Sequence, residues 1–131
     1  MADTSTRMTR EQKVEMAKKA LADSNRGEFS PNGFTPDVVF HGAAMGEVRG
    51  RDAVLSALKA QQSAFAEFRQ EPHAILADDD HVVALVNLSV SAGGKSGQYH
   101  SILVVHTNDQ GQIKEMWSMM DAEALKALQT R

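Results

Sequence analysis

The second half of the chain is a series of short apolar runs separated by turn residues, and this pattern constrains the fold most. Strand-like runs cover 68–77, 82–91, 99–106 and 113–120, and acidic or glycine-rich turns separate the first three. Runs of this length between such turns predict strands joined by tight antiparallel connections. An amphipathic helix expected over 52–68 leads into them. We therefore expect a curved sheet that forms a cup against helices.

Size and charge exclude several classes of protein. The chain has 131 residues, which suits one domain with a substantial core. It contains no cysteine, so disulfides and thiolate metal sites are excluded, and a cytoplasmic location is expected. The net charge is −3 with no clustered basic segment, which argues against nucleic-acid binding. The polar start lacks a signal sequence, and no apolar stretch reaches the ~18 residues of a membrane span.

The first part of the chain is predicted to be a short tail followed by a helix. Residues 1–8 are expected to be a disordered tail, and one domain is expected over 9–131. Thr9 and Gln12 have the spacing of a capping box, which marks a helix start. The helix that follows is predicted to end at Gly27.

Proline and glycine divide the next segment. Two prolines and a glycine within 30–36 predict an irregular connection before a strand over Asp37–His41. Gly42–Gly50 is glycine-rich and is predicted to be a loop, either a mobile flap or a simple connection. Pro72 predicts that its strand lies at a sheet edge or carries a bulge. A short C-terminal helix is expected over 122–129.

The strand predicted over 82–91 has two different faces. One face is wholly apolar, whereas the other changes from apolar at Val83 and Leu85 to polar at Asn87, Ser89 and Ser91. The changing face would suit a deep pocket with a wetter mouth. It would equally suit a strand that leaves the core and becomes exposed, and periodicity alone does not separate the two.

Four segments together resemble the SnoaL-like branch of the nuclear transport factor 2-like superfamily, which also contains ketosteroid isomerases. They are Asp37-Val-Val-Phe-His41, Val48-Arg-Gly-Arg-Asp-Ala-Val54, 75–85 and Gly111-Gln-Ile-Lys-Glu-Met-Trp117. The resemblance covers about residues 9–129. It implies an α+β fold of the cystatin-like type, in which a cone-shaped, curved antiparallel sheet wraps around the N-terminal helices. It also implies an apolar cavity and a homodimer, usually joined through the sheet.

The catalytic sets implied by the resemblance are not matched. A ketosteroid isomerase would need a tyrosine on the first helix, whereas the single tyrosine is Tyr99, in a predicted strand. The central strands lack the arginine of an Asp–Arg–Asp epoxide hydrolase. Cyclases of this branch often end in Glu-His-Trp-Asp, and here the segment is Glu115-Met116-Trp117-Ser118. A serine hydroxyl without a base can orient a ligand but carries protons poorly.

The last predicted strand supplies most of the candidate ligand contacts. Met116, Ser118 and Met120 share one face, which the resemblance places inward. Methionine adapts to irregular apolar ligands, although the same face would also suit ordinary core packing. Phe40 and Asn87 complete the predicted ligand-binding set.

His41 is the candidate general acid or base. It ends the first strand beside the glycine-rich loop, and histidine is the side chain whose unperturbed pKa, roughly 6.5, suits proton transfer near neutral pH. A histidine at a strand end can equally be a hydrogen-bonded surface residue. His100 and His106 lie roughly 20 Å apart on one strand and cannot share a metal ion. No other metal-ligand spacing is present, so neither a metal nor a cofactor is expected.

Three functions remain open at this point. The favoured one is a small-molecule-binding domain of unassigned activity, with an apolar small molecule as ligand and a homodimer as the assembly. The second is an isomerase, cyclase or dehydratase acting on an apolar carbonyl compound, with His41 as general base and Asn87 or Ser118 as hydrogen-bond donor. The third is a dimeric interaction module that uses the apolar face of 82–90 as its interface.

Overall fold

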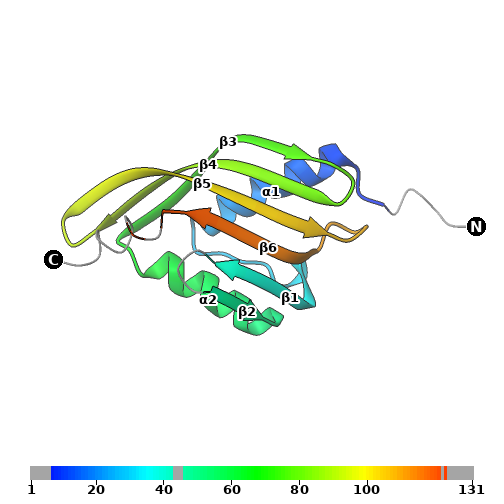
Figure 1. The fold of residues 1–131 in the computed structure, drawn as a ribbon, viewed down its shortest axis with the longest axis horizontal. Helices are drawn as coiled ribbons and strands as arrows, with labels where there is room; N and C mark the ends of the chain where they lie inside the picture. Colours follow the sequence, from blue (N-terminus) through cyan, green and yellow to red (C-terminus); the bar gives the residue numbers. More distant parts are fainter. Residues whose placement is uncertain (1–6, 43–45, 122, 124–131) are drawn as a thin grey trace, which may run out of the picture.

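One six-stranded sheet packs against two helices in the computed structural model, which describes residues 7–42, 46–121 and 123 (Figure 1). The strand order is β2-β1-β6-β5-β4-β3. The elements in chain order are α1 (Arg10–Ser24), the 3₁₀ turn η2 (Pro31–Gly33), β1 (Phe34–Gly42), β2 (Gly46–Arg49), α2 (Arg51–Ser63), β3 (Glu67–Ala77), β4 (His81–Ala92), β5 (Lys95–Thr107) and β6 (Ile113–Met120).

The predicted α+β class and curved sheet are confirmed, but the sheet is mixed and not purely antiparallel. Strands β3 to β6 form an antiparallel meander, and β6 then lies parallel to β1, with Phe40 opposite Met116. The chain reaches the far edge of the sheet through α2 and returns strand by strand to β1. Sequence periodicity does not fix which distant strands pair, so the parallel contact was not predicted.

Both predicted signals at the first helix are present. The Thr9 hydroxyl accepts from the Gln12 amide N–H at 3.1 Å, and the Gln12 side chain accepts from the Thr9 N–H at 2.8 Å. Within the predicted tail, the Met8 N–H donates to the Asp109 carbonyl at 2.7 Å. Residues 1–6 of that tail, and the predicted C-terminal helix apart from residue 123, lie outside the described residues.

Several predicted boundaries are wrong for local reasons. Helix α2 ends at Ser63 and does not reach 68, because Phe68 is a buried residue of β3 whose ring packs 5.4 Å from Phe65. Strand β1 begins at Phe34 and includes Pro36, where the ladder to β6 is irregular and a missing N–H is tolerated. The predicted loop contains strand β2, paired to β1.

The predictions for the meander agree more closely with the structure. Strand β3 lies at an edge of the sheet, and its ladder shifts register between Pro72 and Ala74, as the proline predicted. Gly93 and Gly94 have φ values of 59° and 81° and join β4 to β5. Two consecutive positive φ angles in a two-residue loop form a hairpin turn in which glycine is strongly favoured.

The two faces of β4 lie in different environments. Its apolar face is in the core, with exposures between 0% and 4% at Val82, Ala84, Val86, Leu88 and Val90. This face cannot be a partner interface, so that part of the interaction-module hypothesis is wrong. The other face is the exposed one, since Leu85 is 36% exposed and Asn87 is exposed. The strand therefore does not present its polar half to an interior pocket.

Polar contacts attach α1 to the sheet at both ends. Near its start, Arg10 Nε lies 2.9 Å from Asp79 Oδ1, and the buried Lys13 ammonium donates to the Asp79 carbonyl. After its last residue, the Asn25 side chain donates to the Gln70 carbonyl and accepts from the Gln70 N–H, both at 2.8 Å. The Asn25 amide thus pairs with edge strand β3 as another strand would.

Replacing Asn25 with alanine should destabilise the fold by ~1–3 kcal/mol, because two part-buried backbone groups of Gln70 lose their partner. Denaturant unfolding followed by circular dichroism measures the change. Asn32→Ala is the matched control, since Asn32 is exposed, and its cost should stay within about 0.5 kcal/mol. Equal losses in the two variants would contradict this role for Asn25.

Candidate ligand-binding site

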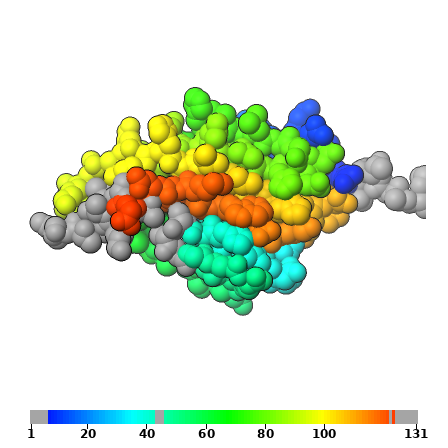
Figure 2. Space-filling model, in the orientation of Figure 1, coloured from blue at the N-terminus to red at the C-terminus, as the bar shows by residue number. Residues whose placement is uncertain are grey.

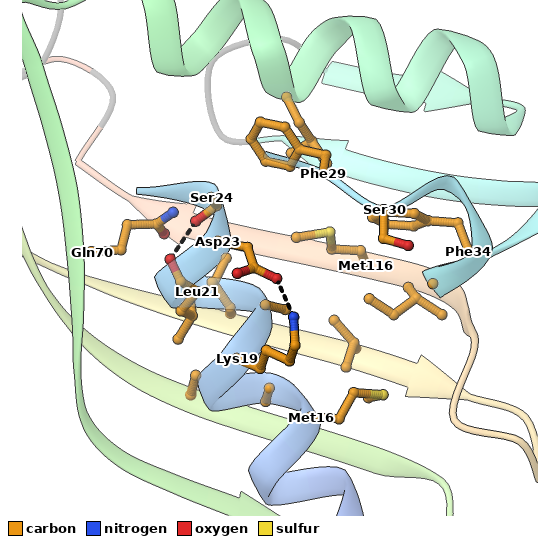
Figure 3. A pocket seen from close by; sticks show the side chains of 18 of the residues that line it. Met16, Lys19, Leu21, Asp23, Ser24, Phe29, Ser30, Phe34, Gln70 and Met116 are labelled. Carbon is orange, nitrogen blue, oxygen red and sulfur yellow. Dashed lines mark hydrogen bonds and ion pairs between the residues drawn. The ribbon is translucent and has the colours of Figure 1, made fainter. Parts of the chain in front are cut away.

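A cavity of about 380 Å³ lies between α1 and the inner face of the sheet (Figure 3). Its floor is formed by apolar residues of three adjacent strands, namely Val82 and Ala84 of β4, Leu103 and Val105 of β5, and Met116 of β6. Phe29, Phe34, Phe40 and Leu58 line it as well. The lining of the cavity is therefore mostly hydrocarbon.

Small side chains on α1 leave this space open. Ala17 and Ala20 line the cavity, and Leu21, which lines it as well, also packs against Ala84 and Val86. An alanine at a helix position that faces a sheet fills less space than a leucine would. Since the helix is attached at both ends, its middle cannot move onto the sheet without breaking those contacts.

Three predicted ligand contacts line this cavity. Phe40, Met116 and Ser118 come from adjacent strands β1 and β6. Met120 shares the face of Met116 and Ser118, but it packs beside the neighbouring core cluster of Phe68, Leu88 and Val90. The role of these residues as ligand contacts stays a prediction.

His41 does not line the cavity. It follows Phe40 in β1, and successive strand residues point to opposite faces. Its Nε2 lies 2.6 Å from Glu115 Oε2, its Nδ1 lies 3.8 Å from Glu47 Oε1, and its ring stacks on Trp117 at 5.5 Å. These contacts hold the His41 ring on the outer face of the sheet. His41 is therefore not placed to move a proton on a molecule inside the cavity.

Asn87 also lies on the outer face. It is opposite His100 on β5, in a polar hollow that includes Glu71, Ser89 and Gln98. Asn87 therefore does not face the cavity that Ser118 lines. The set of His41, Asn87 and Ser118 suggested for an isomerase or cyclase is divided between the two faces of one sheet.

Ser118 is the polar residue on the cavity floor. It is 6% exposed, and its hydroxyl has no hydrogen-bond partner among the described residues. It lies on β6 directly opposite Leu103, with Met116 two residues before it. A buried hydroxyl without a partner costs free energy, so its presence on an apolar surface needs an explanation.

Charged residues also line the cavity. Lys19 Nζ lies 2.9 Å from Asp23 Oδ2, and both residues line the cavity (Figure 3). Arg26 also pairs with Asp23. The hydrogen bond from Lys19, together with the charge of Arg26, lowers the pKa of Asp23. The carboxylate is therefore held ionised, which makes it a weaker base than a free aspartate.

Sequence reasoning missed Lys19 and Asp23 as cavity residues. Their i, i+4 spacing indicates an ion pair on a helix surface, but such pairs occur on most exposed helix faces. It also missed Lys13, which is buried in the stripe of α1 that faces the sheet. Within the described ranges no group of three histidine, aspartate or glutamate side chains could hold a metal ion, and no helix is long and apolar enough to cross a membrane.

A family model described as a SnoaL-like domain matches residues 22–116. Bal32a, from a soil-derived mobile gene cassette, is 18% identical, with a TM-score of 0.81 over 92% of this chain and 98% of that one. A nuclear transport factor 2-like protein of unknown function from Burkholderia pseudomallei K96243 is 18% identical, with a TM-score of 0.78 over 91% and 98%.

TerC, co-crystallized with polyporic acid, is 17% identical, with a TM-score of 0.75 over 88% of this chain and 96% of that one. At identities this low, the three structures establish the fold and nothing further. No curated protein matches the chain.

The Asp23 carboxyl should titrate below the ordinary value near 3.8, and Lys19→Gln should move its midpoint upward. The pKa of Asp23 is lower in the folded than in the unfolded state. The ion pair therefore stabilises the protein fully at pH values above the unfolded-state pKa. This contribution is lost as the pH falls through the folded pKa. Carbon-detected NMR of the carboxyl group measures the midpoint. Lys18→Gln is the control, since Lys18 pairs with Glu15 instead. A midpoint unmoved by Lys19→Gln would contradict the assignment.

Proposed function

The chain belongs to the SnoaL-like domain family, and we propose that it binds a small, mostly apolar molecule in the cavity between α1 and the sheet. The observation that carries the proposal is the cavity itself. Its volume of about 380 Å³ falls within the roughly 300–1,000 Å³ typical of ligand sites. Hydrocarbon walls with a few polar groups are also typical of such sites.

The chemistry of the lining favours binding over acid–base catalysis. Lys19, Asp23 and Glu28 are the ionisable residues among the described lining; Lys19 and Glu28 are mostly exposed, and Asp23 is paired with Lys19 and Arg26. General acid–base catalysis needs a titratable group within hydrogen-bonding reach of the reacting atom. The floor offers the hydroxyl of Ser118, which can orient a molecule but holds no removable proton near neutral pH.

The crystals of TerC contained polyporic acid, a fact about that protein alone. For this chain it supports a small organic molecule as the class of ligand, because the two proteins share the fold.

Filling the cavity should weaken binding. Ala17→Phe places an aromatic ring in the space, and we expect it to weaken the binding of one- and two-ring aromatic compounds at least about tenfold, or ~1.4 kcal/mol. Isothermal titration calorimetry measures the affinities. Ala53→Phe on α2 is the control, since Ala53 is exposed and outside the cavity. Unchanged affinity in a folded Ala17→Phe protein would refute this site.

We further propose that the outer face of the sheet joins two copies of the chain. Leu85, Ile102 and Met119 lie directly opposite one another on β4, β5 and β6 and are 36%, 38% and 50% exposed. The adjacent row across the same strands is Val83, Val104 and Trp117. We call these two rows the outer apolar patch.

Position and shape support a second copy as the partner. The strands present this face to the viewer in Figure 2, and α1 lies behind them. A row of apolar residues across neighbouring strands is self-complementary under a two-fold rotation, which is the symmetry of most homodimers. An exposed apolar patch of this kind commonly marks an interface.

Ile102→Lys should convert a dimer into a monomer, because it places a charge in the middle of the outer apolar patch. Size-exclusion chromatography with light scattering at micromolar concentrations measures the mass. Gln98→Lys, on the same face of β5 but within the polar hollow, should leave the mass unchanged. A monomeric wild-type protein would count against the dimer.

A further inference from the structure

Ser118 interrupts an otherwise apolar floor. The inner faces of β4, β5 and β6 contribute aliphatic side chains to the cavity, and Leu103 lies directly across from Ser118. An alanine at this position would fit the same backbone and the same apolar neighbours. It would also avoid the cost, about 1–3 kcal/mol, of burying a hydroxyl without a partner.

Burial without a partner is not sufficient to indicate a ligand contact. Ser101 on β5 is 2% exposed and its hydroxyl also lacks a partner, yet it does not line the cavity. It lies opposite Met120, on the same inner face and diagonally adjacent to Ser118. Ser118 differs from Ser101 because Ser118 itself lines the cavity. A molecule in the cavity can therefore supply the missing hydrogen bond.

The surroundings of Ser118 restrict the ligand's polar group. A serine hydroxyl donates one hydrogen bond and accepts others, so it pairs with a carbonyl or a hydroxyl oxygen. A carboxylate on this floor would lose its hydration without a cation beside it, which is costly. Lys19 is a cation of the lining, but it is bound to Asp23 and its side chain is 78% exposed. The cavity therefore favours an uncharged oxygen at its floor.

We propose that Ser118 selects neutral, compact, mostly apolar molecules that carry a carbonyl or hydroxyl oxygen, such as phenols and cyclic ketones, over hydrocarbons of the same shape. This inference rests on the proposed small-molecule function. The serine acts by holding the ligand's oxygen and takes no part in a reaction.

Two pairs of probes test the proposal. 2-Naphthol is compared with naphthalene, and 1-indanone with indane, by calorimetry or ligand-observed NMR on the wild-type protein, Ser118→Ala and Ser101→Ala. In the wild type the oxygenated member of each pair should bind more tightly. Ser118→Ala should reduce that preference about three- to tenfold and leave hydrocarbon binding unchanged. Ser101→Ala is the matched control and should keep the preference.

A readout without ligand separates a binding role from a structural one. Each alanine removes an unpartnered buried hydroxyl, so neither variant should lower the melting temperature of the free protein. A clear drop in Ser118→Ala alone would mean that its hydroxyl serves the fold, and would overturn the proposal.

The binding outcomes also separate the proposed role of Ser118 from the proposed small-molecule function on which it rests. If the wild type and Ser118→Ala show the same preference, the role of Ser118 is wrong while small-molecule binding stands. An equal loss of preference in Ser101→Ala would overturn the assignment in the same way. If none of the four probes binds the wild type, the proposed function fails and this inference fails with it.

Discussion

The strict alternation of side chains across a single sheet governs the rest of this structure. Each strand from β4 to β6 sends one set of residues toward the helices and the next set outward. Val82 and Ser118 therefore face the cavity, while Leu85 and Trp117 face away. Two proposals, a ligand on one face and a second copy on the other, follow from this one geometric rule.

The cavity depends on how α1 is attached. The ends of the helix are fixed to the β3–β4 turn through Asp79 and to edge strand β3 through Asn25. Between these attachments the helix contributes Ala17 and Ala20 to the lining of the cavity. Polar contacts at the ends and small side chains in the middle keep a gap that hydrophobic packing would otherwise close.

Much of the fold could be predicted from local patterns. The capping box at Thr9, the glycine turn at Gly93 and the edge proline at Pro72 each have one physical cause within a few residues. The length of α2 could not, because Phe65 and Phe68 have helical spacing yet pack together in the core beyond the end of the helix. Tertiary burial outweighed periodicity there.

Sequence alone determined the family, the strand-rich architecture and the inward face of β6, because these follow from side-chain alternation and from motifs in a fixed order. Only the tertiary structure decided where Asn87 and His41 lie, since a strand's pattern shows that its faces differ but not which face meets a helix. The parallel pairing of β1 with β6 and the position of α1 fix that choice, and both are contacts between distant segments. These contacts place His41 and Ser118 on opposite faces of the sheet. The predicted base therefore lies away from the cavity.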